Sequence, residues 1–332
     1  LDKKEVRKIA VIGNRAESVL KDWYGALPAY SVSALEGIKA AVEDEDVEVR
    51  FQAWDSDGKA QELAAWADVA IVCVGNHPMT SPDWKWEKIQ APWGEGTVAG
   101  DGREAVDRRS LELESEDLIK MVWKANPNTI VALISSFPYT IDWTQEHVPS
   151  ILHVSQCSQE LGNALADVIF GDYNPAGRTT QTWVKDILDL PGMLDYDIRN
   201  GRTYMYFKGE PLYPFGYGLS YTSFEYSRLK VRCQKDSVRL SFDLSNTGGR
   251  DGEEVVQLYV RFPGDDAAMR LRGFERVPVS EGETVRVDLV VPFEDLKLWD
   301  TEAGAFGLAG GRYEFLIGAS SEDIRLSDSV AL

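Results

Sequence analysis

The hydrophobic pattern of this chain changes about two thirds of the way along its 332 residues, and this change restricts the possible folds more than any other feature. In the first part, five short runs are apolar almost without interruption, as strands covered by helices on both faces must be. Segments with apolar residues at helical spacing separate these runs. We therefore predict a layered α/β sandwich domain with a mainly parallel sheet over residues 1–215. Its predicted strands are 8–13, 47–51, 69–74, 130–134 and 151–154, and its predicted helices are 33–42, 58–66, 115–125 and 159–170.

Beyond Gly218, apolar residues alternate with polar ones, and turns rich in Gly or Asn separate the alternating runs. Strands with this two-residue period at regular spacing predict an antiparallel, immunoglobulin-like sandwich of the fibronectin type III kind over residues 216–332. The boundary segment 211–221 (PLYPFGYGLSY) is rich in Pro, Gly and aromatic residues. We expect this segment to form an ordered strap instead of a flexible linker. The predicted strands are 238–244, 255–261, 284–290 and 312–317.

Composition excludes several classes of partner. A net charge of −19 repels phosphate backbones and anionic lipid, so we expect neither nucleic acid nor membrane surfaces as partners. Cys73, Cys157 and Cys233 lie far apart and lack paired spacing, and the chain has three histidines, so we predict no disulfide framework, no metal site and no cofactor. Neither a membrane span nor a leader is visible, and the cellular compartment stays open. Because the chain starts without Met and enters a strand at once, we expect it to begin inside a longer gene product.

Some local motifs are weak indicators of function. Gly13 follows the first predicted strand, but the further glycines of a dinucleotide-binding loop are missing, which favours a simple tight turn. Ser135, Ser136 and Ser155 lack the surroundings of a nucleophile elbow, so we interpret them as structural hydroxyls. His77 follows the third predicted strand, where open α/β sheets place ligand groups. It fits equally a ligand contact and a loop histidine with satisfied hydrogen bonds.

The connection between the third predicted strand and the helix at 115–125 is roughly forty residues long, a length that usually indicates a functional loop. It holds the charged stretch GREAVDRRSL (102–111) and three tryptophans, Trp84, Trp86 and Trp93. Indole rings stack well on sugar rings, and they also anchor loops to a core. Both interpretations apply to each tryptophan, so the loop is a candidate binding segment on the strength of its length and its charge.

Motifs over nearly the whole chain resemble the C-terminal half of glycoside hydrolase family 3 enzymes, which is an α/β sandwich domain followed by a fibronectin type III-like domain. The resemblance implies a retaining, exo-acting β-glycosidase, β-glucosidase-like, that hydrolyses terminal sugars from oligosaccharides or glycosides. A β-xylosidase or an enzyme that releases xyloglucan disaccharides is the alternative. The matching motifs are 163–178 (NALADVIFGDYNPAGR), 211–221 (PLYPFGYGLSY), 246–248 (NTG), 254–260 (EVVQLYV), 271–274 (LRGF) and 298–300 (LWD).

The same resemblance assigns a role to the charged stretch. Family members carry the acid/base catalyst as the Glu of a Glu-Gly-x-Asp-Arg motif, which Glu104-Ala105-Val106-Asp107-Arg108 matches except at Ala105. We therefore expect Glu104 to be the acid/base residue, with Asp107 and Arg108 fixing the loop's shape. Because the loop is longer than usual, Glu95 is the runner-up. A general acid has to keep its proton near neutral pH, which explains why charge is concentrated around it.

By the same resemblance, His77 and the three tryptophans are expected to bind the leaving-group side of the substrate. The nucleophile is missing, since retaining glycosidases need two carboxyl groups about 5 to 5.5 Å apart. Its family motif resembles Ser-Asp-Trp in a (β/α)8 barrel, and this chain has neither the length nor the repeat for a barrel. Asp83, which precedes Trp84, is a coincidence in this interpretation. We expect a barrel chain or domain as partner, leave a homo-oligomer open, and keep a non-catalytic carbohydrate-binding or scaffolding fragment as the competing hypothesis.

Overall fold

The computed structural model describes residues 1–17, 19, 28–54, 57–76, 110–155 and 159–332. These residues form two compact units, 1–173 and 174–332. The expected domain boundary between residues 215 and 216 rests on the change in hydrophobic pattern, which is a different criterion from compactness, and it stays a prediction.

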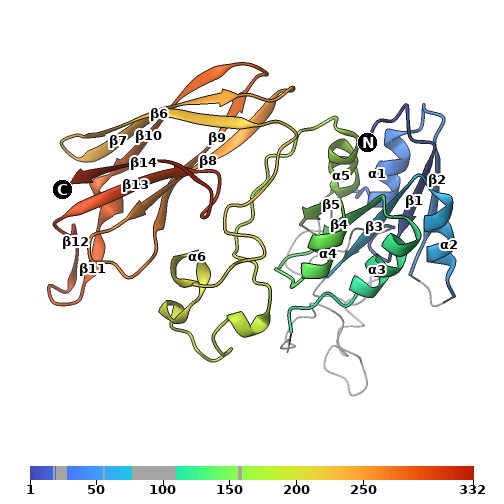
Figure 1. The fold of residues 1–332 in the computed structure, drawn as a ribbon, viewed down its shortest axis with the longest axis horizontal. Coiled ribbons are helices and arrows are strands. Elements are labelled where there is room, and N and C mark those ends of the chain that lie inside the picture. Colours follow the sequence, from blue (N-terminus) through green and yellow to red (C-terminus); the bar gives the residue numbers. More distant parts are fainter. Residues whose placement is uncertain (18, 20–27, 55–56, 77–109, 156–158) are drawn as a thin grey trace. The chain divides into compact units, whose positions relative to one another are not determined.

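The first unit contains a five-stranded sheet in which every neighbouring pair is parallel (Figure 1). Two interior strands, β3 and β4, are buried along their whole length, which explains why their sequences are continuously apolar. The predicted parallel sheet is thereby confirmed. In the spatial order β2-β1-β3-β4-β5, the strands are Glu48–Gln52, Lys8–Ile12, Val69–Gly75, Thr129–Ile134 and Ser150–Val154.

Helices cover both faces of this sheet. On one face lie α1 (Ala34–Ala41) and α5 (Leu161–Phe170). These two helices form one hydrophobic core with every second side chain of β1, β3 and β4. Gly37 and Gly162 let these two helices approach closely, because a Cβ on Gly37 would lie 2.1 Å from the backbone of Gly162. The opposite face is covered by α2 (Lys59–Trp66), α3 (Glu116–Ala125) and α4 (Asp142–His147) (Figure 1).

The second unit is a sandwich of two antiparallel sheets. Apolar side chains of β7 and β8 meet between the sheets, with Leu240, Phe242 and Leu258 fully buried. This arrangement confirms the predicted immunoglobulin-like sandwich. One sheet has the order β10-β7-β6 (Thr284–Pro292, Ser237–Asn246, Phe224–Cys233), the other has the order β14-β13-β8-β9 (Ile324–Ala331, Arg312–Gly318, Gly252–Arg261, Arg270–Val279), and β11 (Leu298–Asp300) pairs with β12 (Ala305–Gly307).

The segment before the sandwich contains only short helices. Its chain path runs through η2, η3 and α6 before it reaches the strap 211–221. A further short helix, η4, follows β10 within the sandwich. The short helices are Ile187–Asp189 (η2), Ile198–Asn200 (η3), Thr203–Tyr206 (α6) and Phe293–Leu296 (η4).

The strap 211–221 is held by hydrogen bonds on two sides. Leu212 donates its backbone N–H to the carbonyl oxygen of Trp183 at 2.7 Å, and Gly216 donates to that of Thr179 at 2.8 Å. The Nε2 atom of the buried Gln257 side chain donates to the carbonyl oxygen of Gly216 at 3.0 Å. An ordered strap, as predicted, is what the structure shows.

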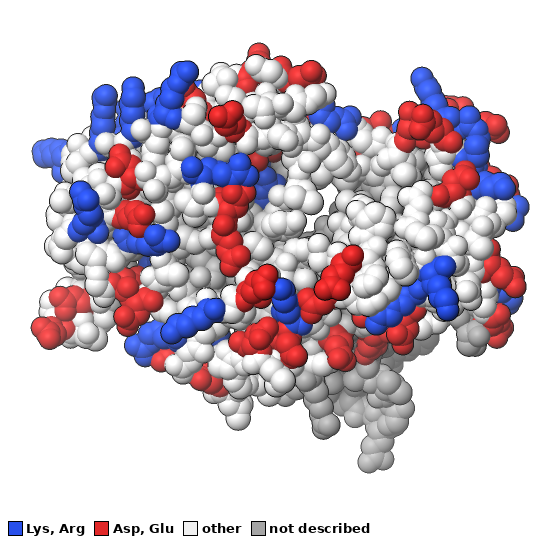
Figure 2. All heavy atoms as spheres, viewed as in Figure 1, with Lys and Arg blue, Asp and Glu red and all other residues white. Residues whose placement is uncertain are grey.

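On the face drawn in Figure 2, positive and negative side chains are not separated into large patches. Lys and Arg side chains are interspersed with Asp and Glu side chains on the face drawn in Figure 2. Across the described helices, none has the length and apolar character that crossing a membrane requires.

Candidate functional site

The strand order of the first unit identifies the edge of the sheet where a site is expected. Strands β1 and β3 are neighbours in the sheet, and the strand order reverses between them. The strand that follows β1 in the sequence, β2, lies on one side of this pair, and the strand that follows β3, β4, lies on the other side. Helix α1 accordingly covers one face of the sheet and α2 the other. Open α/β sheets bind ligands outside the carboxyl ends of the strands at such a switch point. The residues that leave β1 and β3 therefore form the candidate site.

Two glycines shape this edge. Gly75 ends β3 with a φ of 140°, and a Cβ there would lie 1.9 Å from the carbonyl oxygen of Ile134. Gly13 follows β1 with a φ of 113°, and a Cβ there would lie 2.3 Å from the carbonyl oxygen of Cys73. Only glycine fits either position, since both the backbone conformation and the space exclude a side chain. Gly13 thus serves as the tight turn that the sequence predicted.

Asn76 is the residue at this edge that sequence reasoning missed. Its side chain is 1 % exposed, and its Oδ1 atom accepts a hydrogen bond from the backbone N–H of Ser136 at 3.1 Å. This bond joins the ends of β3 and β4. The Nδ2 atom is buried and has no hydrogen-bond partner among the described residues. The signal in the sequence was an asparagine directly after a strand-ending glycine.

A serine and a histidine meet nearby. The Oγ atom of Ser135 lies 3.1 Å from Nε2 of His153, which belongs to β5. Loss of water around the imidazole lowers the pKa of His153, although the residue as a whole is exposed. Ser135 is fully buried, and a nucleophile must be reachable by its substrate. The hydroxyl of Ser135 therefore has the structural role that the sequence predicted.

All the predicted site residues lie outside the described residues. The structure does fix both ends of the segment that carries them. Asn76 leaves the carboxyl end of β3, and the carbonyl oxygen of Leu111 accepts a hydrogen bond from the backbone N–H of Thr140, in the connection that follows β4, at 2.9 Å. The segment therefore begins and ends beside the carboxyl edge of the sheet. The residues concerned are His77, Trp84, Trp86, Trp93, Glu95, Glu104, Asp107 and Arg108.

Among the side chains that the structure describes, no three His, Cys, Asp or Glu residues are grouped so as to hold a metal ion. The described part of the edge instead carries the buried amide of Asn76 and the imidazole of His153. Groups of this kind bind and orient neutral polar molecules by hydrogen bonding.

Comparisons with known proteins agree with this architecture. Residues 1–221 match the glycosyl hydrolase family 3 C-terminal domain, and residues 254–321 match the fibronectin type III-like domain. A xylan 1,4-beta-xylosidase of Xylanibacter ruminicola is 38 % identical over an alignment of 293 residues, which covers 84 % of this chain and 33 % of the relative. A beta-glucosidase of Rhizobium radiobacter is 33 % identical over an alignment of 297 residues, which covers 82 % of this chain and 34 % of the relative.

A solved structure shows the same fold over both units. The crystal structure of a beta-D-glucoside glucohydrolase from Trichoderma reesei superposes with a TM-score of 0.84 and 25 % identity, covering 99 % of this chain and 52 % of that one. The chain thus spans about a third of the length of the two curated relatives and about half of the solved chain.

Proposed function

The chain belongs to glycosyl hydrolase family 3, and from this premise we propose that it is the part of a retaining, exo-acting β-glycosidase that supplies the acid/base carboxylate and the leaving-group subsite. Glu104 is the proposed acid/base residue, and Glu95 is its runner-up. The observation that carries the proposal is the Glu-x-x-Asp-Arg spacing of Glu104, Asp107 and Arg108 in a segment whose two ends lie at the carboxyl edge of the sheet.

The proposed chemistry divides the reaction between two parts of the enzyme. Glu104 donates a proton to the glycosidic oxygen as that bond breaks, while a carboxylate on the other part attacks the anomeric carbon. In the second step Glu104 removes a proton from the water that hydrolyses the glycosyl-enzyme intermediate. We propose that the nucleophile belongs to a (β/α)8 barrel outside the 332 residues, and that the chain alone is inactive.

The length comparison supports a partner domain. The relatives extend well beyond the region that this chain matches, which leaves room for the part that holds the second carboxylate. Within the chain, we propose that His77 and at least one of Trp84, Trp86 and Trp93 bind the leaving group. Stacking of an indole ring on the leaving sugar favours binding without requiring charge development.

The sugar at the cleaved bond is a separate proposal. We propose a terminal β-glucosyl residue, with β-xylosyl as the second candidate because a xylosidase and a glucosidase both occur among the similar proteins. Comparing kcat/KM for aryl glucosides and aryl xylosides with the same leaving group decides between them, since the leaving-group contribution is then equal.

The test of Glu104 uses the enzyme completed with its barrel part. We expect Glu104→Ala to slow the hydrolysis of substrates with poor leaving groups by about 10²–10⁴-fold, and that of dinitrophenyl glycosides far less in the glycosylation step. Azide should rescue Glu104→Ala, because a small anion replaces the water that needs a base. Glu95→Ala is the matched control and should not be rescued.

Two results would change the assignment. Azide rescue of Glu95→Ala alone would move the acid/base role to Glu95. Undiminished activity in both variants would remove the role from this segment and favour a non-catalytic carbohydrate-binding or scaffolding fragment.

A further inference from the structure

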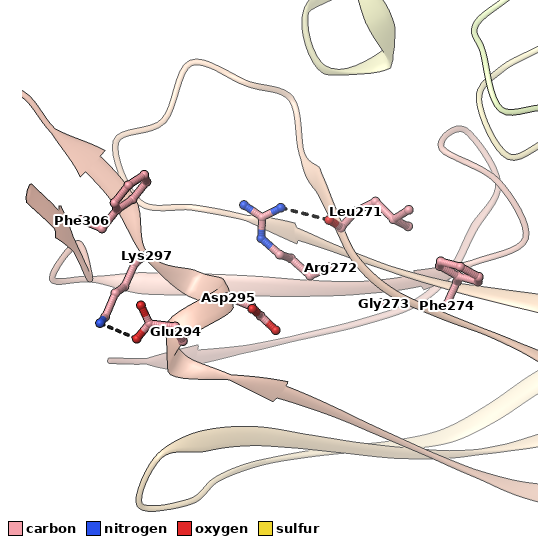
Figure 3. Close-up of a pocket in the computed structure, with 8 residues that line it drawn as sticks. All are labelled: Leu271, Arg272, Gly273, Phe274, Glu294, Asp295, Lys297 and Phe306. Carbon is pink, nitrogen blue, oxygen red and sulfur yellow. Dashed lines mark hydrogen bonds and ion pairs between the residues drawn. The ribbon is translucent and has the colours of Figure 1, made fainter.

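A hollow lies on the sandwich of residues 174–332, formed entirely within that unit. Its volume is about 590 Å³, within the range typical of small-molecule sites. Side chains from β9, η4 and β12 line it, so three elements that are separate in the sequence meet there (Figure 3). The lining residues are Leu271, Arg272, Gly273, Phe274, Glu294, Asp295, Lys297 and Phe306.

Two phenylalanines present their rings to solvent at this hollow. Phe274 is 68 % exposed and Phe306 is 65 % exposed, although large aromatic side chains are usually mostly buried. They lie at opposite ends of the group of side chains drawn in Figure 3. Trp299 supports Phe306 edge-on, with ring centroids 5.3 Å apart. The hollow therefore offers two separate, exposed aromatic surfaces.

Charged hydrogen-bonding groups lie between these rings. The guanidinium of Arg272 is held 5.0 Å from the Phe262 ring centroid, and its Nη1 atom donates to the carbonyl oxygen of Leu271 at 3.0 Å. The Asp295 side chain projects from η4 and is drawn beside Arg272 in Figure 3. A planar guanidinium and a carboxylate supply several donors and acceptors at once.

The charges of the hollow cancel. Lys297 forms an ion pair with Glu294 at 2.5 Å, and the other two charged residues of the lining, Arg272 and Asp295, carry opposite charges. A hollow without net charge, on a chain whose net charge is −19, does not favour a polyanion. The ligand that suits it is neutral, rich in hydroxyl groups, and has apolar faces that can lie on aromatic rings.

We propose that this hollow is a binding site for a neutral β-linked oligosaccharide or polysaccharide segment, formed by residues other than those of the acid/base segment and independent of the assignment of Glu104. Pyranose rings lie on Phe274 and Phe306, and hydroxyls of the sugars between them hydrogen-bond to Arg272 and Asp295. Pyranoses combine a C–H face with a rim of hydroxyls, which matches aromatic surfaces separated by paired donors and acceptors. Such a site holds the chain on a glycan surface while terminal sugars are processed elsewhere.

The size of the hollow favours a saccharide over a protein. A stable protein interface involves about 20–30 residues on each side and about 800 Å² per partner. Eight residues line the hollow, which is too few for that. A second copy of this chain is therefore the outcome that the experiment has to separate from a saccharide.

The experiment measures binding of the full 332-residue chain to cellohexaose, xylohexaose and laminarihexaose by isothermal titration calorimetry, with native gels containing the corresponding soluble polysaccharides. We expect at least one of these neutral glycans to bind, and Phe274→Ala and Phe306→Ala each to weaken binding about fivefold or more. Tyr196→Ala is the matched control, because Tyr196 is 83 % exposed in the same unit but does not line the hollow. Since all three rings are exposed, the variants should keep the thermal midpoint of the parent.

Three results would overturn the proposal. One is the absence of binding to all three glycans in both assays. Another is an equal loss of affinity in Tyr196→Ala, which would place the saccharide elsewhere. The third is concentration-dependent dimerisation in analytical ultracentrifugation that Phe274→Ala abolishes while glycan affinity stays unchanged, which would identify the hollow as an interface between copies.

Discussion

The ion pair between Arg178 and Glu254 offers the sharpest test of what holds the second unit together. The Nη2 atom of Arg178 lies 2.9 Å from Oε1 of Glu254, and the side chains are only 8 % and 6 % exposed. Burial, followed by the negative charge of Glu254, raises the pKa of the neighbouring Tyr226 hydroxyl far above its usual value. Water is therefore largely excluded from the surroundings of the pair. Removing either partner leaves the other charge buried without compensation.

The expected magnitude follows from this burial. Arg178→Met or Glu254→Leu should each lower the free energy of unfolding of this unit by about 3–5 kcal/mol. At about 2–4 °C per kcal/mol for a unit of this size, the thermal midpoint falls by about 6–20 °C. The double variant should recover most of the loss, because apolar side chains of similar volume replace a buried pair at little cost. The coupling energy in the cycle should therefore exceed about 2 kcal/mol.

The assay is urea unfolding followed by circular dichroism on the parent, both single variants and the double variant. Lys185→Met is the matched control, because Lys185 pairs with Glu210 at 3.0 Å in the same unit with both side chains exposed. That change should cost less than about 1 kcal/mol. The reasoning is refuted if the single variants at the buried pair lower the free energy of unfolding by no more than the control does. It is also refuted if the loss in the double variant equals the sum of the losses in the two single variants.

Three further predictions concern other parts of the fold. Gly75→Ala should lower the free energy of unfolding in urea by roughly 3 kcal/mol, because a φ of 140° is strained for alanine and the new Cβ meets a backbone carbonyl. Gly58→Ala is the control and should cost about 1–2 kcal/mol, because Gly58 has a φ of 84° but open space around it. Equal losses in the two variants would contradict this prediction. Burial raises the pKa of the Cys73 thiol to about 12, so this thiol is inert in the folded protein. In a variant without Cys157 and Cys233, Cys73 should react with a thiol reagent only after the protein has been unfolded. A hydrogen bond from Arg286 lowers the pKa of the Asp243 carboxyl in the folded protein. The ionised carboxylate therefore stabilises the fold fully at pH values above the pKa that Asp243 has in the unfolded chain, and this stabilisation is lost as the pH falls through its pKa in the folded protein. The difference in urea midpoint between the parent and Asp243→Asn should therefore shrink from about pH 5 to about pH 3, and a constant difference would refute it.

The fold was predictable from sequence wherever burial was uniform along an element. Both faces of β3 and β4 are covered, and alternate residues of β8 and β10 face the core, so each strand has a readable pattern. Strand β6 escaped prediction because its register shifts between Ser227 and Lys230, where Arg228 adopts a φ of 57°. A bulge moves the later side chains to the other face and interrupts the alternation.

Short elements held by side chains were also missed. Helix α4 has six residues, of which Trp143 is the one large apolar side chain, so no helical period is visible. Its position depends on Glu116, whose Oε1 atom accepts hydrogen bonds from the backbone N–H and the hydroxyl of Thr144. Asn76 was missed for a related reason. Its importance lies in a buried amide between two strand ends, and strand pairing is not visible in a local sequence.

The motifs that reveal the family and the residues proposed for catalysis are separate sources of information. Asn174 accepts a hydrogen bond from the backbone N–H of Tyr221 at 2.7 Å, and Gln257 donates to Gly216, so motifs far apart in the sequence meet in the second unit. Their agreement with the family therefore reflects packing. A chain could keep all of these contacts and lose its chemistry, because Glu104 belongs to none of these motifs. For that reason additional similarity in the sandwich would not strengthen the catalytic proposal, and the azide experiment on Glu104 separates an enzyme part from a scaffold with the same fold.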